Sequence, residues 1–361
     1  MKIFKISIAL ICFCLSNLTL AASGVFPSSV FENLDYGLYW FGTDDNYEKA
    51  EPGYSNAYYD NSAPTVIYIH GWQNGSSQNL KRETFNRSEN GGPNKDLAYA
   101  WRQAGYNVGV LYWNQFADES EVKDAEAKIW VTNGPRQMRW RDNNGNYHTG
   151  PNKNATQLIF ESLRDNMANY NGNRLVITGH SLGNQMAVVV AKKIKDGITA
   201  GNTNSNLKPT RIALLDPFYS NGSKSYLNNQ WTGAVARDYV DTLKNWGVLF
   251  EAYRSSSVTN TVFVGDANKG LLNKTALVEL KPWYFWAWQQ AEKHGAAVWH
   301  YFWSFEFNAP SIKRSSDRGL SASTSDSRVQ QLMNGNKGLI HDLGAYSKSP
   351  SDDRFKYKNR L

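Results

Sequence analysis

The five residues from Gly179 to Gly183 (Gly-His-Ser-Leu-Gly) constrain this chain more than any other stretch. Residues 175–178 before them are apolar or β-branched and predict a buried strand, and apolar residues after them recur at helical spacing. A serine flanked by glycines between a strand and a helix indicates a sharp turn, because the glycines leave out side chains that would clash there. The sequence therefore predicts Ser181 at the tip of this turn, beside the first N–H groups of a helix.

Strand-like and helical patterns alternate along the rest of the chain. The runs that predict strands are 65–69, 108–113, 175–178, 212–215, 248–250 and 261–264, and helical patterns include 96–104 and 155–170. Apolar strands that alternate with helices are typical of an α/β fold, in which a mostly parallel central sheet has helices on both faces. We expect one such domain over residues 23–310, with a polar insertion at about 114–151. Residues 311–361 are polar and predict a loosely ordered C-terminal extension with one short helix near 329–333.

The N-terminal segment 1–22 has the pattern of a signal peptide. Two lysines precede an apolar run, and small residues follow at Ala21 and Ala22. An uncleaved membrane anchor is the alternative, but the apolar run is short for a span. Both cysteines, Cys12 and Cys14, lie in this segment, so the mature chain would have no disulfide, no thiolate nucleophile and no cysteine metal site. We expect a secreted or periplasmic protein.

Charge narrows the class of partner. The formal net charge is +7, and removal of Lys2 and Lys5 with the signal peptide would leave +5. This balance suits solubility or contact with an anionic lipid surface, and the sequence has no basic stripe or motif that predicts a nucleic-acid partner. The oligomeric state is not predicted.

A serine hydroxyl becomes a nucleophile only with a general base, and the base needs a group to orient it. In chains with this serine turn the order is serine, acid, histidine. Asp216 directly follows the strand at 212–215, which places its carboxylate on the edge where open α/β sheets bind ligands. Asp266 and Glu251 are the rival acids, and Asp216 could instead simply cap its turn. His294, His300 and His341 are the histidines far enough downstream to act as the base.

A second turn comes directly after the strand at 65–69. His70, Gly71 and Trp72 follow that strand, and a glycine there lets a backbone N–H point at a developing oxyanion. We expect the N–H groups of Trp72 and Leu182 to form this oxyanion hole. His70 is interpreted as a packed residue that supports the loop.

Taken together, three motifs resemble the pancreatic-lipase-like branch of the α/β hydrolases. They are His70-Gly71-Trp72, Gly179-His180-Ser181-Leu182-Gly183 and Leu215-Asp216-Pro217. The resemblance implies an α/β-hydrolase fold in a secreted bacterial lipase or esterase, with Ser181, Asp216 and His294 as catalytic residues. It selects His294 because this branch has an aromatic residue seven positions and a serine ten positions after its histidine, as Tyr301 and Ser304 stand here. It implies lipid or phospholipid ester hydrolysis without a metal or organic cofactor.

Aromatic residues crowd the segment around His294. They stand at Trp283, Tyr284, Phe285, Trp286, Trp288, Trp299, Tyr301, Phe302, Trp303, Phe305 and Phe307. They could wall an acyl pocket, form a lid at a bilayer interface, or pack in the core beneath the last helix. Two functional alternatives stay open at this point: an esterase or amidase that acts on soluble or cell-wall esters, and a non-catalytic protein that binds a ligand on a hydrolase scaffold.

Overall fold

The computed structural model describes residues 24–88, 91–261 and 265–361. The predicted signal peptide at 1–22 lies outside these residues, as does most of the strand predicted at 261–264.

A single large sheet organises the chain. Within the described residues it has eleven strands, in the order β13 (Ser311–Ile312), β15 (Arg354–Asn359), β14 (Lys337–Leu343), β12 (Ala276–Glu279), β11 (Leu249–Arg254), β10 (Arg211–Leu215), β9 (Leu175–His180), β3 (Thr65–Ile69), β6 (Asn107–Tyr112), β1 (Gly37–Phe41) and β2 (Tyr47–Lys49). The consecutive strands from β14 to β6 run parallel. Strand β15 is antiparallel to β14 and parallel to β13, and β1 is antiparallel to both β6 and β2. The predicted α/β fold with a mostly parallel sheet is confirmed.

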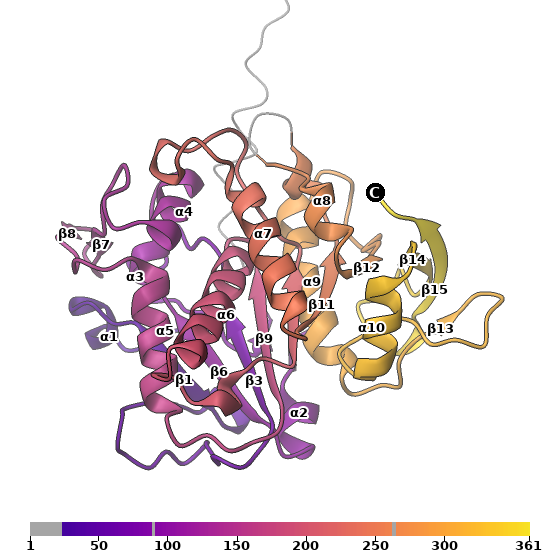
Figure 1. Cartoon of the computed structure of the whole chain (residues 1–361), viewed down its shortest axis with the longest axis horizontal. Coiled ribbons are helices and arrows are strands. Elements are labelled where there is room, and N and C mark those ends of the chain that lie inside the picture. The colour runs from indigo at the N-terminus through magenta and orange to yellow at the C-terminus, as the bar shows by residue number, and fades with distance from the viewer. Residues whose placement is uncertain (1–23, 89–90, 262–264) are drawn as a thin grey trace, which may run out of the picture.

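Helices cover both faces of this sheet (Figure 1). One face carries α5 (Ala155–Asn166), α6 (Gly183–Thr199), α7 (Thr232–Asn245) and α10 (Asp326–Asn334), and the other carries α2 (Tyr99–Gln103) and α9 (Gln290–Ser304). Strands β3, β6, β9 and β10 are buried along their whole length, which explains their near-continuous apolar sequences. Helices α2 and α9 meet on their face, where the Trp101 indole donates to Phe302 O at 2.9 Å and stacks on Phe305.

The insertion predicted at 114–151 carries short elements that pack at one end of α5. They are α3 (Asn114–Ala117), α4 (Val122–Trp130) and the hairpin of β7 (Trp140–Arg141) and β8 (Tyr147–His148). Lys128 is buried there, and its ammonium group lies 2.7 Å from Glu119 Oε1 while also donating to backbone carbonyls. The remaining short elements are α1 (Ser29–Glu32), α8 (Lys269–Leu272) and the hairpin of β4 (Asn86–Arg87) and β5 (Lys95–Asp96).

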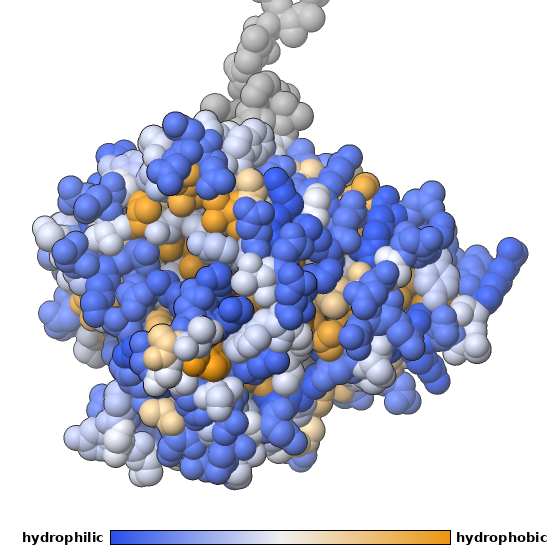
Figure 2. All heavy atoms as spheres, in the orientation of Figure 1, coloured by the Kyte–Doolittle hydropathy of each residue, from blue (hydrophilic) through white to orange (hydrophobic). Residues whose placement is uncertain are grey.

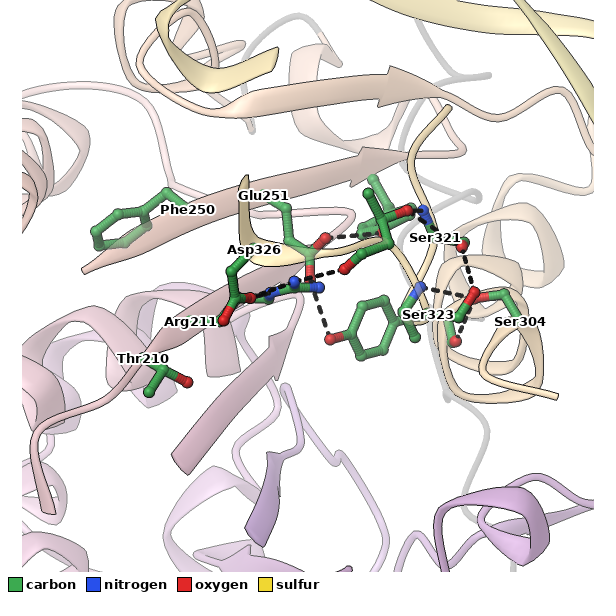
Figure 3. Close-up of polar contacts among 12 residues, drawn as sticks. Thr210, Arg211, Phe250, Glu251, Ser304, Ser321, Ser323 and Asp326 are labelled. Carbon is green, nitrogen blue, oxygen red and sulfur yellow. Dashed lines mark hydrogen bonds and ion pairs between the residues drawn. The ribbon is translucent and has the colours of Figure 1, made fainter. Parts of the chain in front are cut away.

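The C-terminal segment 311–361 is not a loose extension, contrary to its polar sequence. It contributes α10 and three strands of the main sheet. The reason is a polar junction around a buried arginine (Figure 3): Arg211, at the start of β10, donates to half-buried Asp326 Oδ1 at 2.5 Å and to Thr324 O at 2.6 Å. On the α9 side, Ala322 N donates to Ser304 Oγ at 3.0 Å. Side chains that look like solvated loop residues therefore hold this segment to the sheet.

The face that carries α5, α6 and α7 is largely hydrophilic (Figure 2). Figure 2 shows small, separated apolar patches among polar side chains on the face that carries α5, α6 and α7. Among the residues described, no helix is both long enough and apolar enough to cross a membrane.

Candidate active site

Ser181 sits at the turn between β9 and α6, as the sequence predicted. Its backbone has φ +55°, the left-handed region that non-glycine residues rarely occupy. A Cβ on Gly183 would collide with Ile69 O, so only glycine lets the end of β3 approach the turn this closely. A Cβ on Gly71 would lie 2.7 Å from Ser181 Cβ, which places the loop after β3 directly against the serine.

Parallel register brings the loops after four strands to one edge of the sheet. Gly179 in β9 is paired with Ile69 in β3, and His180 is paired with Leu215 in β10. Leu215 is paired in turn with Tyr253 in β11. The residues that follow these strands therefore share the carboxyl edge, where open α/β sheets place their ligands.

The histidine brought to this edge is His294, from the second turn of α9. Its Nδ1 lies 2.6 Å from Asp216 Oδ2, and both side chains are buried. Because the carboxylate accepts at Nδ1, the proton of neutral His294 stays on that nitrogen and its Nε2 keeps a lone pair. Residues 78 positions apart thus form a base with an orienting acid.

Asp216 is held as an anion despite its burial. Oδ1 accepts the N–H groups of Ser255 at 2.8 Å and Ser256 at 3.2 Å, and Oδ2 accepts the Ser256 hydroxyl together with His294. Burial by itself raises the pKa of Asp216, but the hydrogen bond of His294, its charge when protonated, and the hydrogen bonds of the two serines outweigh burial and lower that pKa. The carboxylate therefore stays charged beside the imidazole.

His180 ties the serine turn to the base. Its Nε2–H donates to the backbone carbonyl of His294 at 3.1 Å, and the two rings lie 4.4 Å apart between centroids. Burial and the nearby charge of His294 lower the pKa of His180 to about 3, so it stays neutral. Within the described residues no hydrogen bond joins Ser181 Oγ to His294, and the link between their segments runs through His180.

The two donors predicted for an oxyanion hole are open. Within the described part of the chain, neither the Trp72 N–H nor the Leu182 N–H donates to a protein acceptor. The Trp72 side chain is anchored, since its indole donates to Glu119 O at 2.6 Å. Leu182 directly precedes α6, so its N–H belongs to the positive end of that helix.

His70 fixes the peptide that carries the Trp72 N–H. Trp113 N donates to His70 Nε2 at 3.1 Å, which leaves the ring proton on Nδ1, and Nδ1 lies 2.9 Å from Gly71 O. The C=O and N–H of a trans peptide point in opposite directions, so holding the Gly71 carbonyl on His70 turns the Trp72 N–H away from His70. Burial lowers the pKa of His70 to about 4, which keeps this tautomer.

The rival acids lie in other surroundings. Glu251 accepts from Tyr253 and Tyr301, each at 3.0 Å, at the junction shown in Figure 3. Asp266 accepts Asn268 N at 2.9 Å ahead of α8. Neither carboxylate contacts a histidine within the described residues.

The rival histidines share a different carboxylate. His300 Nε2 lies 2.5 Å from one oxygen of Asp353, and His341 Nε2 lies 3.2 Å from the other. Ligand atoms of these three residues lie within 4.8 Å of one another, a spacing that could hold a metal ion. However, Lys281 N–H donates to His341 Nδ1 at 3.0 Å, which places the ring proton on the nitrogen that faces Asp353. The donor set fits two histidines on one carboxylate better than it fits a metal.

Sequence reasoning missed Ser255 and Ser256, which hold the carboxylate of Asp216. A usable signal was present, because these serines follow the strand that neighbours β10 and therefore end on the same edge. It also missed Gln185, which donates to Glu126 at 2.7 Å and to Phe218 O at 2.8 Å and so joins α4 to the serine turn. No sequence pattern marks that contact.

One family model matches part of this chain. The family model described as Lipase (class 3) matches residues 119–205, a stretch that contains Ser181 and all of α6. The motifs themselves resemble the pancreatic-lipase-like branch, so motifs and family match agree at the level of a lipase. Among the curated proteins, none matches this chain.

Three similar solved structures are hydrolases. Esterase B from Lactobacillus rhamnosis is 17% identical, with 63% of this chain and 69% of that chain covered and a TM-score of 0.25. An acylaminoacyl peptidase from Pyrococcus horikoshii is 11% identical, with 68% of this chain and 31% of that chain covered and a TM-score of 0.30. An α/β hydrolase from the metagenome of Lake Arreo is 16% identical, with 62% of this chain and 52% of that chain covered and a TM-score of 0.25. The chain thus spans from about a third to about two thirds of their lengths. The mostly parallel sheet and the serine-turn motif agree with the partial match to the Lipase (class 3) family model, which covers residues 119–205.

Proposed function

We propose that this protein is a serine carboxylic-ester hydrolase of the lipase type, with Ser181 as nucleophile, His294 as general base and Asp216 as the acid that orients it. The observation that carries the proposal is the buried His294–Asp216 pair, 2.6 Å apart, on the edge that also carries Ser181 in a left-handed turn. A strained serine and a buried imidazole–carboxylate pair on one edge form the arrangement that activates a hydroxyl.

The reaction follows from these positions. Ser181 Oγ attacks the ester carbonyl carbon as its proton passes to His294 Nε2, and the carbonyl oxygen becomes an oxyanion. The C–O bond to the alcohol then breaks, and His294 gives that proton to the departing oxygen. Water attacks the acyl-enzyme in the same way, its proton taken by His294 and then returned to Ser181 Oγ as the acid leaves. Every proton is accounted for without a cofactor.

Charge develops at two places in this sequence. The oxyanion is stabilised by the open N–H groups of Trp72 and Leu182 and by the positive end of α6. The imidazolium is stabilised by Asp216, whose lowered pKa keeps it charged. His180 stays neutral next to the imidazolium because its own pKa is about 3, so it adds no repulsion.

Lipid or phospholipid esters are the proposed substrates. The support is the aromatic segment around His294 and the lipase class of the family match. A signal peptide at 1–22 would deliver the mature enzyme to the periplasm or the medium, where it would contact such lipids at a membrane surface.

A fluorophosphonate probe tests the mechanism, because it labels only an activated serine. Wild type is expected to be labelled on Ser181, whereas Ser181→Ala and His294→Gln are not, and Ser223→Ala, which removes an exposed serine, is labelled like wild type. Absence of labelling in folded wild type would refute the mechanism and favour a non-catalytic binding protein.

Ester series then test the substrate class. Turnover of esters with increasing acyl length should hold or rise beyond short chains for a lipase. A steep decline beyond short acyl chains would replace the lipase with an esterase for soluble or cell-wall esters.

A further inference from the structure

Four large aromatic side chains are exposed on one edge of the sheet. Trp283, Trp286 and Trp288 are 52%, 68% and 75% exposed, and Tyr346 is 77% exposed. Tryptophan is usually well buried: Trp299, behind the loop, is fully buried, and Trp231, at 41%, is less exposed than these three. Such a group of exposed rings marks a surface that meets something other than water.

Topology places these rings on the same edge as Ser181. The loop that carries the three tryptophans, residues 281–289 (the aromatic loop), follows β12, and Tyr346 follows β14. Strands β12 and β14 run parallel to β9, which ends at the serine turn. The aromatic loop also leads directly into α9, whose second turn holds His294.

The rings are arranged in two pairs. Trp286 and Trp288 are parallel, with centroids 5.4 Å apart, and Trp283 lies 5.2 Å from Tyr346. Beneath them the loop is anchored by Phe285, which is buried and lies edge-on to Trp299. The exposed rings are therefore presented on a fixed support.

The backbone of the loop is already hydrogen-bonded. Trp283 N donates to Ala345 O at 2.8 Å, Trp286 N donates to the Gln289 side chain at 2.8 Å, and Gln290 N donates to Trp288 O at 2.8 Å. Entry into a less polar medium would therefore strand few backbone donors. Within the described residues, the indole N–H groups of the three exposed tryptophans have no protein acceptor, so they can donate to lipid oxygens.

The flanks of the loop are hydrophilic and carry positive charge. Lys293 lies in the first turn of α9, directly after the loop, and Lys348 lies two residues after Tyr346 in the chain; neither forms an ion pair within the described residues. A depression of about 310 Å³ between the loop and the Ser255–Ser257 segment is lined by Trp283, Lys293 and Ser256, and Ser256 holds Asp216. Aromatic tips with lysines behind them match the layering of a phospholipid surface, where acyl chains lie below charged headgroups.

We propose that the aromatic loop and Tyr346 form a docking surface for a phospholipid bilayer, with the tryptophan tips seated at the level of the headgroups. The reason for docking rests on the proposed function, because the surface would bring lipid esters to the edge of the sheet that carries Ser181. The docking itself needs no catalysis.

Vesicle binding by the full chain tests this surface. In a Ser181→Ala background, which leaves the vesicles intact, the protein should co-sediment with vesicles of equimolar phosphatidylcholine and phosphatidylglycerol. The Trp286→Ala/Trp288→Ala double substitution should lower the vesicle–water partition coefficient about tenfold or more, because two aromatic rings that would be buried in the bilayer are lost. Trp286→Phe/Trp288→Phe should recover part of it.

A matched pair of tyrosines supplies the control. Tyr346→Ala should weaken binding, whereas Tyr54→Ala should not, because Tyr54 is equally exposed but precedes β3 and so lies at the opposite edge of the sheet. Equal binding by the tryptophan double variant and its parent, at matched thermal stability, overturns the proposal. If the tryptophan double variant binds vesicles like its parent but no longer binds insoluble peptidoglycan, the proposal is overturned and the aromatic loop is a glycan-binding surface.

Failure of the docking surface and failure of the proposed function give different results. Loop-dependent vesicle binding by a chain that the fluorophosphonate probe does not label supports the docking surface and removes the hydrolase mechanism. Labelling of Ser181 in a chain that does not bind vesicles supports the hydrolase mechanism and removes the docking surface.

Discussion

Asp216 Oδ2 lies 2.6 Å from Nδ1 of His294, in a setting where both side chains are buried and three further donors from Ser255 and Ser256 complete the shell of the carboxylate. No other acid contacts this histidine within the described residues. A buried anion with this many donors is costly to build, which points to a role beyond stability.

The first prediction concerns this acid. Asp216→Asn should lower kcat/KM for esters about 10⁴-fold, because the amide no longer favours the tautomer with its proton on Nδ1 of His294. Steady-state hydrolysis of a soluble ester measures it. Asp266→Asn is the control and should retain near-wild-type rates, since among the residues described Asp266 accepts a side-chain hydrogen bond from its own turn before α8 and contacts no histidine. Equal losses in both variants would contradict the assignment.

The sequence could predict those parts of the site that follow from strand order, but not the contacts between residues far apart along the chain. Ser181 and Asp216 directly follow their strands and Trp72 is the third residue after β3, so strand order and parallel register alone bring them to one edge. His294 needed the resemblance, because a helix residue after the last of these strands has no register that fixes it. His180 was overlooked because its partner is a backbone carbonyl 114 residues away.

The C-terminal segment shows where local sequence patterns fail to predict structure. Residues 311–361 are polar, and their serines and charges predict a solvated extension. In the structure Asp326 meets Arg211, a charged residue at the start of a buried strand, and that pairing is invisible to local periodicity. Three strands of the main sheet were missed for this reason.

The second prediction separates the two properties of His180. His180→Phe keeps a ring against His294 but loses the donor to the His294 carbonyl, whereas His180→Gln keeps an N–H donor. A hydrogen bond contributes about 1 kcal/mol, so His180→Phe should lower kcat about fivefold to tenfold with little change in KM. His180→Gln should recover part of that loss. Identical kinetics in both variants would show that only the packing matters.

The third prediction concerns the loop after β3. Gly71→Ala would place a methyl group 2.7 Å from Ser181 Cβ and 3.0 Å from His180 O, so the loop must shift away from the serine. The shift would misplace the Trp72 N–H and should lower kcat about 10²-fold or more. Gly338→Ala in β14 meets only ordinary contacts of 3.4 Å or longer and serves as the control. Unchanged kcat in Gly71→Ala would remove Trp72 from the oxyanion hole.

The fourth prediction is a loss of stability in acid. The pKa values of buried His70 and His180, about 4 and about 3, lie below the ordinary value of 6.5. Below pH 6.5 the unfolded chain takes up protons that the folded chain refuses, so the free energy of unfolding falls as pH drops from 6.5 toward 4. Each histidine contributes a slope of about 1.4 kcal/mol per pH unit in that window. Urea denaturation at a series of pH values should show a smaller slope in His180→Phe, and an equal slope would contradict the buried neutral state.

The fifth prediction concerns the junction in Figure 3. Asp326→Ala removes the carboxylate that Arg211 shares with Arg174, so the almost fully buried guanidinium of Arg211 keeps Thr324 O and the more distant Glu251 but loses its charged hydrogen-bond acceptor. The free energy of unfolding should fall by about 1–3 kcal/mol, as measured by urea denaturation.

Asp317→Ala is the matched control: it removes an exposed carboxylate that contacts Arg328 and Tyr357 and should change stability by less than about 0.5 kcal/mol. Hydrolysis of a soluble ester should persist in Asp326→Ala at temperatures below its transition, because the junction lies at the start of β10 and Asp216 follows its end. If both variants unfold at the same urea concentration as wild type, the polar junction does not hold the C-terminal strands, and packing of α10 against β11 and β12 must do so instead.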